Sequence, residues 1–171
     1  MEDIEFDTIL LADKPIVWTF AAMKKFEARA KGILKKLEIK PGANHTGYFL
    51  ANYLRISEVL EAAITASTGL NGMEGKKGEP SEAMQAIEDY LEQGGTLDEL
   101  QRAIYLAFLE KNDPSSIPIW LAEIQRNIRV MEINQKKEEA KLEIARLELE
   151  ADQKKIEEMK ASGKQSTESD M

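Results

Sequence analysis

The longest hydrophobic pattern in the chain lies near its C-terminus, in residues 117–160. Apolar side chains recur there at alternating spacings of three and four residues, at Leu121, Ile124, Ile128, Met131, Leu142, Ala145, Leu149, Ile156 and Met159. Polar side chains fill the remaining positions of the same register, at Gln135, Glu138 and Asp152. This spacing is the heptad repeat of coiled coils. We call the whole stripe the seam, and it predicts one long amphipathic helix.

A helix of this length cannot bury the seam against itself. At ~1.5 Å per residue it would extend roughly 65 Å, beyond the width of a domain built from the preceding residues. Its outer part is therefore either a solvated, charged helix or a partner surface, for a second copy of the chain or for an amphipathic helix of another protein. The polar interruptions favour a reversible contact, because buried charges weaken a coiled coil. The apolar residues of the seam are the candidate partner-binding residues.

Shorter patterns upstream predict a small helical domain over residues 1–116. Two β-leaning runs within residues 8–19, separated by Asp13 and Lys14, predict a hairpin. Helical periodicity predicts helices at about 20–37, 46–67, 81–93 and 97–111. Phe20 should lie on the apolar face of the first helix, and the second should be the central helix of the core. The polar, aperiodic residues 161–171 predict a disordered tail, which leaves the fold class mainly α.

Several single residues carry local signals. Gly94 and Gly95 predict a left-handed end to the third helix, and Thr96 with Glu99 predicts a capping box at the start of the fourth. Asn44 or Thr46 is expected to cap the helix over 46–67, with His45 as a loop residue beside the cap. We expect Trp18 and Trp120 to be core anchors at the edges of the domain.

Composition narrows the function classes. A formal net charge of -8 and a pI near 4.9 argue against nucleic-acid binding, which needs a basic face. No run approaches the ~20 apolar residues that a membrane span needs, and the acidic start of the chain is unlike a signal peptide. The absence of cysteine excludes disulfides and thiolate metal sites. With one histidine and no recognisable ligand motif, we expect no catalytic residue, no cofactor and no metal.

Two stretches resemble a known family. Residues 14–27, Lys-Pro-Ile-Val-Trp-Thr-Phe-Ala-Ala-Met-Lys-Lys-Phe-Glu, and residues 87–104, with their Gly-Gly-Thr-Leu break, are similar to the tail assembly chaperones of long-tailed, siphovirus-like bacteriophages. These are small, acidic, mainly helical proteins. The resemblance covers roughly residues 8 to 110 and rests on patterns rather than on invariant chemistry.

The resemblance implies a non-enzymatic protein in the cytoplasm of the bacterial host, absent from the mature virion. It would bind the tape-measure protein, keep it soluble and help to recruit tail-tube subunits. The family pattern does not include residues 117–160, so assigning tape-measure binding to the seam is our inference from its spacing. The alternative is a homo-oligomeric coiled-coil scaffolding protein, which would form a stable dimer or higher oligomer by itself.

Overall fold

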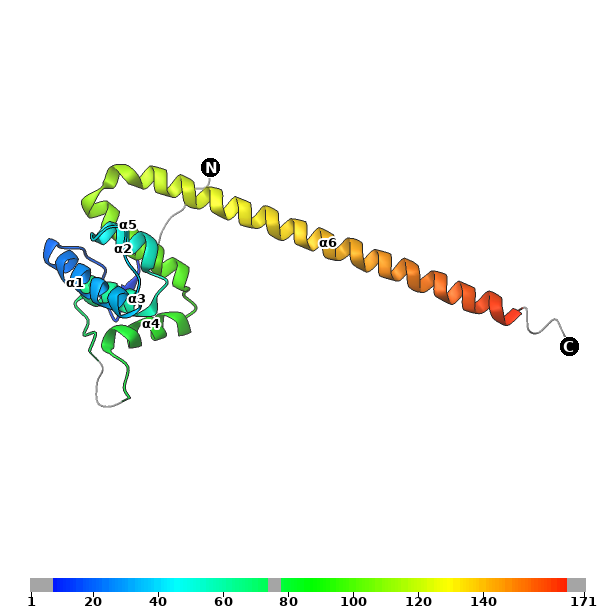
Figure 1. The fold of residues 1–171 in the computed structure, drawn as a ribbon, viewed down its shortest axis with the longest axis horizontal. Helices are drawn as coiled ribbons and strands as arrows, with labels where there is room; N and C mark the ends of the chain where they lie inside the picture. The colour runs from blue at the N-terminus through cyan, green and yellow to red at the C-terminus, as the bar shows by residue number, and fades with distance from the viewer. Residues whose placement is uncertain (1–7, 74–77, 166–171) are drawn as a thin grey trace. The chain divides into compact units, whose positions relative to one another are not determined.

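The computed structural model describes residues 8–73 and 78–165, and the fold is mainly α with a short hairpin, as the sequence predicted. Its elements are β1 (Leu10–Leu11), β2 (Lys14–Pro15), α1 (Phe20–Lys36), α2 (Thr46–Tyr53), α3 (Ser57–Thr68), α4 (Glu82–Glu92), α5 (Leu97–Asn112), the 3-10 turn η1 (Pro114–Ser116) and α6 (Ile117–Gln165) (Figure 1). The chain divides into two compact units, Met1–Ile119 and Trp120–Met171.

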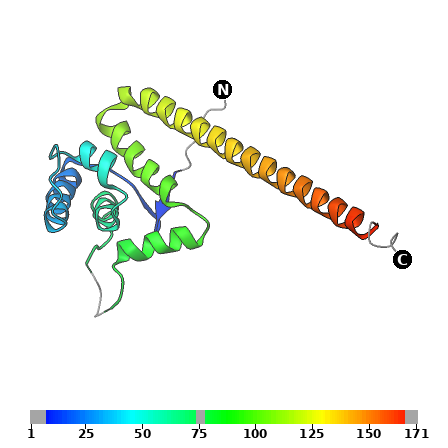
Figure 2. The same ribbon diagram turned by 45° about the vertical axis from the view of Figure 1, so that its right-hand side comes forward.

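The hairpin is shorter than predicted, and its turn comes one residue earlier. Leu10 pairs with Pro15 and Leu11 with Lys14 in an antiparallel register. Ala12 and Asp13 form the turn with φ values of 47° and 60°, which is the pair of positive angles of a type I′ turn. The strand pairing ends after Pro15, because the residues that follow pack against the helices and cap the start of the first one. β1 lies against α4 and β2 against α3 (Figure 2).

The core forms between α1 and α3, which share the most extensive contact of any two elements (Figure 1). Trp18 is 1% exposed, as predicted for a core anchor. Its indole N–H donates to the carbonyl oxygen of Ile104 at 3.1 Å, and its ring meets Phe26 edge-on with 5.5 Å between centroids. One side chain thereby joins the start of α1 to the middle of α5.

Phe20 does not join this core, contrary to our prediction. Its side chain is 72% exposed, and the amino group of Lys24 lies 5.5 Å from the ring centroid. The hydroxyl of Thr19 caps α1 by accepting from the backbone N–H of Ala22. Ala22 then faces the core together with Phe26, one turn later. Phe20 precedes Ala22 by two residues, or about 200° of helix rotation, which turns it to the opposite side.

The helix predicted over 46–67 is two helices, α2 and α3. Ile56 adopts an extended backbone, with φ −79° and ψ 118°, and the chain changes direction there. The apolar residues of this stretch cover more than half of a helix circumference, so one straight helix would expose some of them. The break lets Phe49 of α2 and Val59 of α3 both be fully buried. Within this pair, α3 supplies the central core helix.

The cap of α2 is His45, not Asn44 or Thr46 as predicted. The Nδ1 atom of His45 accepts from the backbone N–H of Tyr48 at 3.2 Å. Thr46 is buried instead, and both its backbone N–H and its hydroxyl donate to Oε1 of Glu27 at 3.1 Å. The single histidine therefore has a structural role at the start of a helix.

The junction of α4 and α5 matches its prediction. Gly94 has φ 96°, and the N–H groups of Gly94 and Gly95 donate to the carbonyl oxygens of Leu91 and Tyr90 at 3.1 Å each. These are the paired bonds of a Schellman C-cap. The hydroxyl of Thr96 accepts from the backbone N–H of Glu99, whose carboxylate accepts from the backbone of Thr96, which completes the capping box.

The last helix differs from its prediction at its end. α6 continues to Gln165, so residues 161–165 are helical rather than disordered, and the remainder of the predicted tail lies outside the described residues. Alanine, lysine and glutamine propagate a helix readily once it exists. Trp120 is partly exposed and is not among the core residues, so its prediction as a core anchor is wrong.

Candidate partner-binding surface

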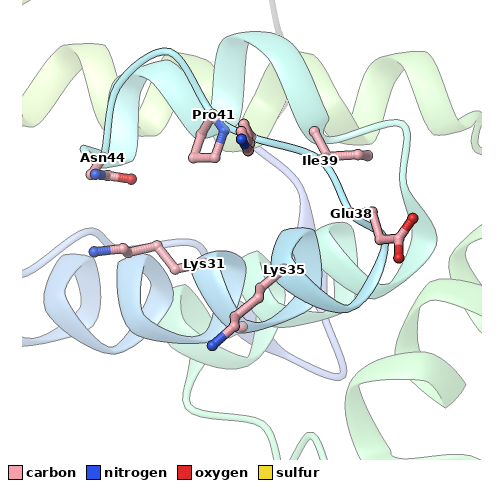
Figure 3. A pocket seen from close by; sticks show the side chains of 8 residues that line it. Lys31, Lys35, Glu38, Ile39, Pro41 and Asn44 are labelled. Carbon is pink, nitrogen blue, oxygen red and sulfur yellow. The ribbon is translucent and has the colours of Figure 1, made fainter.

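A hollow of about 620 Å³ lies beside the C-terminal half of α1 (Figure 3). Lys31 and Lys35 line it from the helix, and Ile39 and Pro41 from the segment that follows. Most of its lining residues are exposed. Figure 3 shows that the amino groups of Lys31 and Lys35 do not converge on a common point. The hollow therefore lacks the convergent, buried polar groups of a built ligand site.

Two carboxylates of the domain, Glu27 and Glu99, have lowered pKa values and accept hydrogen bonds at the start of a helix. Burial would raise the pKa of Glu27, but its bonds with Lys24 and Thr46 outweigh burial and lower the pKa. Backbone and side-chain hydrogen bonds from Thr96 lower the pKa of Glu99. Each of these carboxylates is committed to hydrogen bonds at the start of a helix. In the part of the chain that the structure describes, no cluster of three or more His, Cys, Asp or Glu is arranged to hold a metal ion.

The seam lies on α6, which runs as one helix through all of its residues. Leu121, Ile124 and Ile128 are partly buried, and Ala145 is exposed. The five large apolar residues of the outer part are between 47% and 71% exposed, namely Met131, Leu142, Leu149, Ile156 and Met159. Because a heptad spacing keeps side chains on one side of a helix, these residues share one face, on which polar side chains separate them into groups. The outer half of the seam is an apolar surface without a cover.

A second apolar strip on α6 escaped the sequence analysis. Val130, Ile133, Ile144 and Leu147 are each between 50% and 57% exposed. They follow seam positions by two residues, or about 200°, so this second strip faces nearly opposite to the seam. The sequence does contain this pattern, because Val130 and Ile133 are three residues apart and so are Ile144 and Leu147. The second strip is shorter than the seam, which extends from Leu121 to Met159.

Ion pairs between near neighbours stabilise α6 from within. Arg146 bonds Glu143 at 3.3 Å and Glu150 at 3.4 Å, all on exposed side chains. The acidic interruptions of the seam have such partners too: Glu138 lies 2.7 Å from Lys141, and Asp152 lies 3.7 Å from Lys155. Each exposed pair contributes roughly 0.3–0.5 kcal/mol. These bonds support the helix without covering its apolar surfaces.

Comparison with known proteins finds no family model, no curated protein and no solved structure that matches the chain. Across the described stretches, none of the helices combines the length and apolar content that crossing a bilayer requires.

The helix α6, with its exposed apolar side chains, is the element best suited to bind another chain. Its geometry suits an apolar stripe on a helix of another chain, packed side by side along its length.

Proposed function

We propose that the chain is a tail assembly chaperone of a long-tailed, siphovirus-like bacteriophage. It binds the tape-measure protein along the seam, keeps that protein soluble and helps to recruit tail-tube subunits. The observation that carries the proposal is the uncovered outer half of the seam, from Met131 to Met159. Large apolar side chains that lie exposed along one face of a helix are typical of an interaction site.

The chemistry of the seam suits a client that must later be released. A tape-measure protein is long and largely helical, and it carries apolar stripes that aggregate when uncovered. The seam offers such a stripe a matching row of side chains. Gln135, Glu138 and Asp152 interrupt that row, and each polar residue in a buried contact lowers its stability. Weak, repeated contacts allow tail-tube subunits to displace the chaperone as they polymerise.

The net charge of -8 supports the same role. Mutual repulsion between acidic proteins keeps a complex dispersed, and the charged side chains between the two apolar strips would coat a bound client. The proposed place of action is the cytoplasm of the infected cell, and the proposed protein is absent from the finished virion. Its activity consists of binding and release, without a chemical step.

Co-expression with the tape-measure protein of the same genome tests this function. The chain is tagged at Met1 and compared with a version that ends at Met131, which removes the seam beyond that residue. We expect soluble tape-measure protein to co-purify with the full chain and to be lost with the shortened one. If the tape-measure protein stays insoluble with both, and the chain purifies as a stable oligomer, the homo-oligomeric scaffolding function replaces this proposal.

A further inference from the structure

Charged residues flank the seam on both of its sides. The residues that directly follow Ala145 and its equivalents in the other heptads include Glu132, Glu139, Arg146 and Lys160. The residues that directly precede Leu142 and its equivalents in the other heptads include Lys141, Glu148 and Lys155. In a pair of helices these flanking residues meet across the contact, and their signs decide orientation and register. The signs of these flanking charges therefore indicate which partner helix the seam fits.

A parallel pairing of two copies is disfavoured by these charges. In the parallel register, each flanking residue on the Lys141 side meets the residue five positions later on the other helix. Lys141 would lie opposite Arg146 of the second copy, and Lys155 opposite Lys160, and symmetry repeats both contacts. The other flanking contacts combine a charged residue with a neutral one or two neutral residues. A parallel pair would thus contain like-charge contacts without any attractive one.

An antiparallel pairing centred between Glu143 and Ile144 reverses this result. Glu139 then lies opposite Arg146 of the second copy, and Lys141 lies opposite Glu148 of the second copy. Both contacts are attractive and both occur twice by symmetry. The other flanking contacts again include a neutral residue, so no like charges meet. Moving the register by one heptad in either direction sets identical charged residues against each other, such as Glu139 against Glu139 or Arg146 against Arg146.

The residues of the seam fit the same register. Leu142 meets Ala145 of the second copy at the centre, and the outer apolar layers combine Ile128 with Met159 and Met131 with Ile156. The polar interruptions Gln135 and Asp152 fall in one layer, where they can bond each other instead of facing apolar side chains. Glu138 faces Leu149, but its carboxylate already has Lys141 of its own helix at 2.7 Å.

We propose that two copies of the chain pair through the seams of α6, antiparallel and centred between Glu143 and Ile144. The flanking charges select this arrangement and the composition of the layers fits it, and neither depends on the chaperone function. The pair leaves the second strips of both helices facing outward. A client that uses the seam competes with the second copy, which protects the apolar surface while no client is present.

Charge variants test the pairing on the full chain without any client. The change Glu139→Lys with Glu148→Lys makes every attractive contact repulsive and leaves all the salt bridges of α6 in place. The matched control, Glu157→Lys with Glu158→Lys, makes the same change in net charge away from the contact. Sedimentation equilibrium should show a dimer for the wild-type chain and the control. The Glu139/Glu148 variant should dimerise about 100-fold more weakly.

A complementary variant provides a rescue. Lys141→Glu with Arg146→Glu makes all four residues of the attractive contacts negative, while the first variant makes all four positive. Each should fail to pair with itself, and an equimolar mixture should form a mixed dimer with every contact attractive. Because the second variant also loses ion pairs within α6, circular dichroism checks that the mixture remains helical.

The direction of pairing is measured with a spin label on a single introduced cysteine, Glu157→Cys, since the chain has no other. In the antiparallel pair the two labels lie about 27 residues apart along the axis, or roughly 40 Å. In a parallel pair they lie within about 20 Å. A short distance overturns the proposal. So does a chain that is monomeric at all concentrations, or a dimer that the Glu139/Glu148 variant leaves unchanged.

Discussion

Replacing Trp18 tests the packing of the domain. Its side chain is almost completely buried, contacts the ring of Phe26, and donates a hydrogen bond to the carbonyl oxygen of Ile104. Truncation of a buried Trp to Ala costs about 3–5 kcal/mol, through lost burial and the cavity that remains. Since a domain of this size is stable by only ~5–15 kcal/mol, Trp18→Ala should remove roughly a fifth or more of its free energy of unfolding.

The variant Trp18→Phe separates the two contributions. It keeps an aromatic ring in the core but deletes the indole donor, which contributes about 1 kcal/mol, so the expected loss is about 1–2 kcal/mol. Trp120→Ala is the control and should cost less than about 1 kcal/mol, because Trp120 is partly exposed and lies outside the core.

Urea unfolding followed by near-ultraviolet circular dichroism measures these free energies. This signal comes from packed aromatic side chains, so the helical signal of α6 does not obscure the domain. The reasoning is refuted if Trp18→Ala costs less than about 1 kcal/mol, or if the Phe and Ala variants lose equal stability. The second result would assign the whole effect to the hydrogen bond.

Three further predictions concern ionisation, an unpaired hydroxyl and the seam. Because the pKa of Glu27 is lowered in the folded chain, its ionised carboxylate stabilises the fold at neutral pH, and this stabilisation is lost as the pH falls below the ordinary value of 4.5. Urea titrations should therefore show that acid lowers the free energy of unfolding less for Glu27→Gln than for the wild-type chain. The hydroxyl of Ser67 is buried without a hydrogen-bond partner among the described residues, so thermal unfolding of Ser67→Ala should show unchanged stability or a gain of up to about 1 kcal/mol. The Glu139→Lys, Glu148→Lys variant keeps every apolar residue of the seam but loses the competing second copy, so a pull-down should recover at least as much tape-measure protein as the wild-type chain does; a marked loss would contradict the competition.

Local rules predicted the parts of the fold that depend on a few adjacent residues. The Gly94–Gly95 end of α4 and the capping box of α5 follow from steric and hydrogen-bonding needs that only neighbouring residues can meet. The break between α2 and α3 could not be read in this way. It depends on how Phe49 and Val59 reach the same core, which is a property of the three-dimensional packing. Phe20 was misplaced because it was grouped with the apolar face of α1, although the helical period puts it about 200° from the buried Ala22.

The surface of α6 was predictable in part. The seam was found because its spacing is regular over many turns, whereas the second strip contains fewer large apolar residues and lies almost opposite. Exposure values were needed to show that Ile144 and Leu147 are more than half exposed, although less so than Leu142 and Leu149 of the seam. The register of self-pairing is also contained in the sequence. It emerges only when the flanking charges are compared between two copies, as for Glu139 and Arg146.

The central claim is that the seam, and not the second strip, holds the client. Two matched variants test it directly: Leu142→Asp with Leu149→Asp places two carboxylates in the seam, and Ile144→Asp with Leu147→Asp places two in the second strip. Each is co-expressed with the tape-measure protein, and the soluble tape-measure protein that co-purifies is measured. The account predicts that the seam variant loses the client while the second-strip variant retains it. Retention by the seam variant, or loss only with the second-strip variant, would contradict the claim.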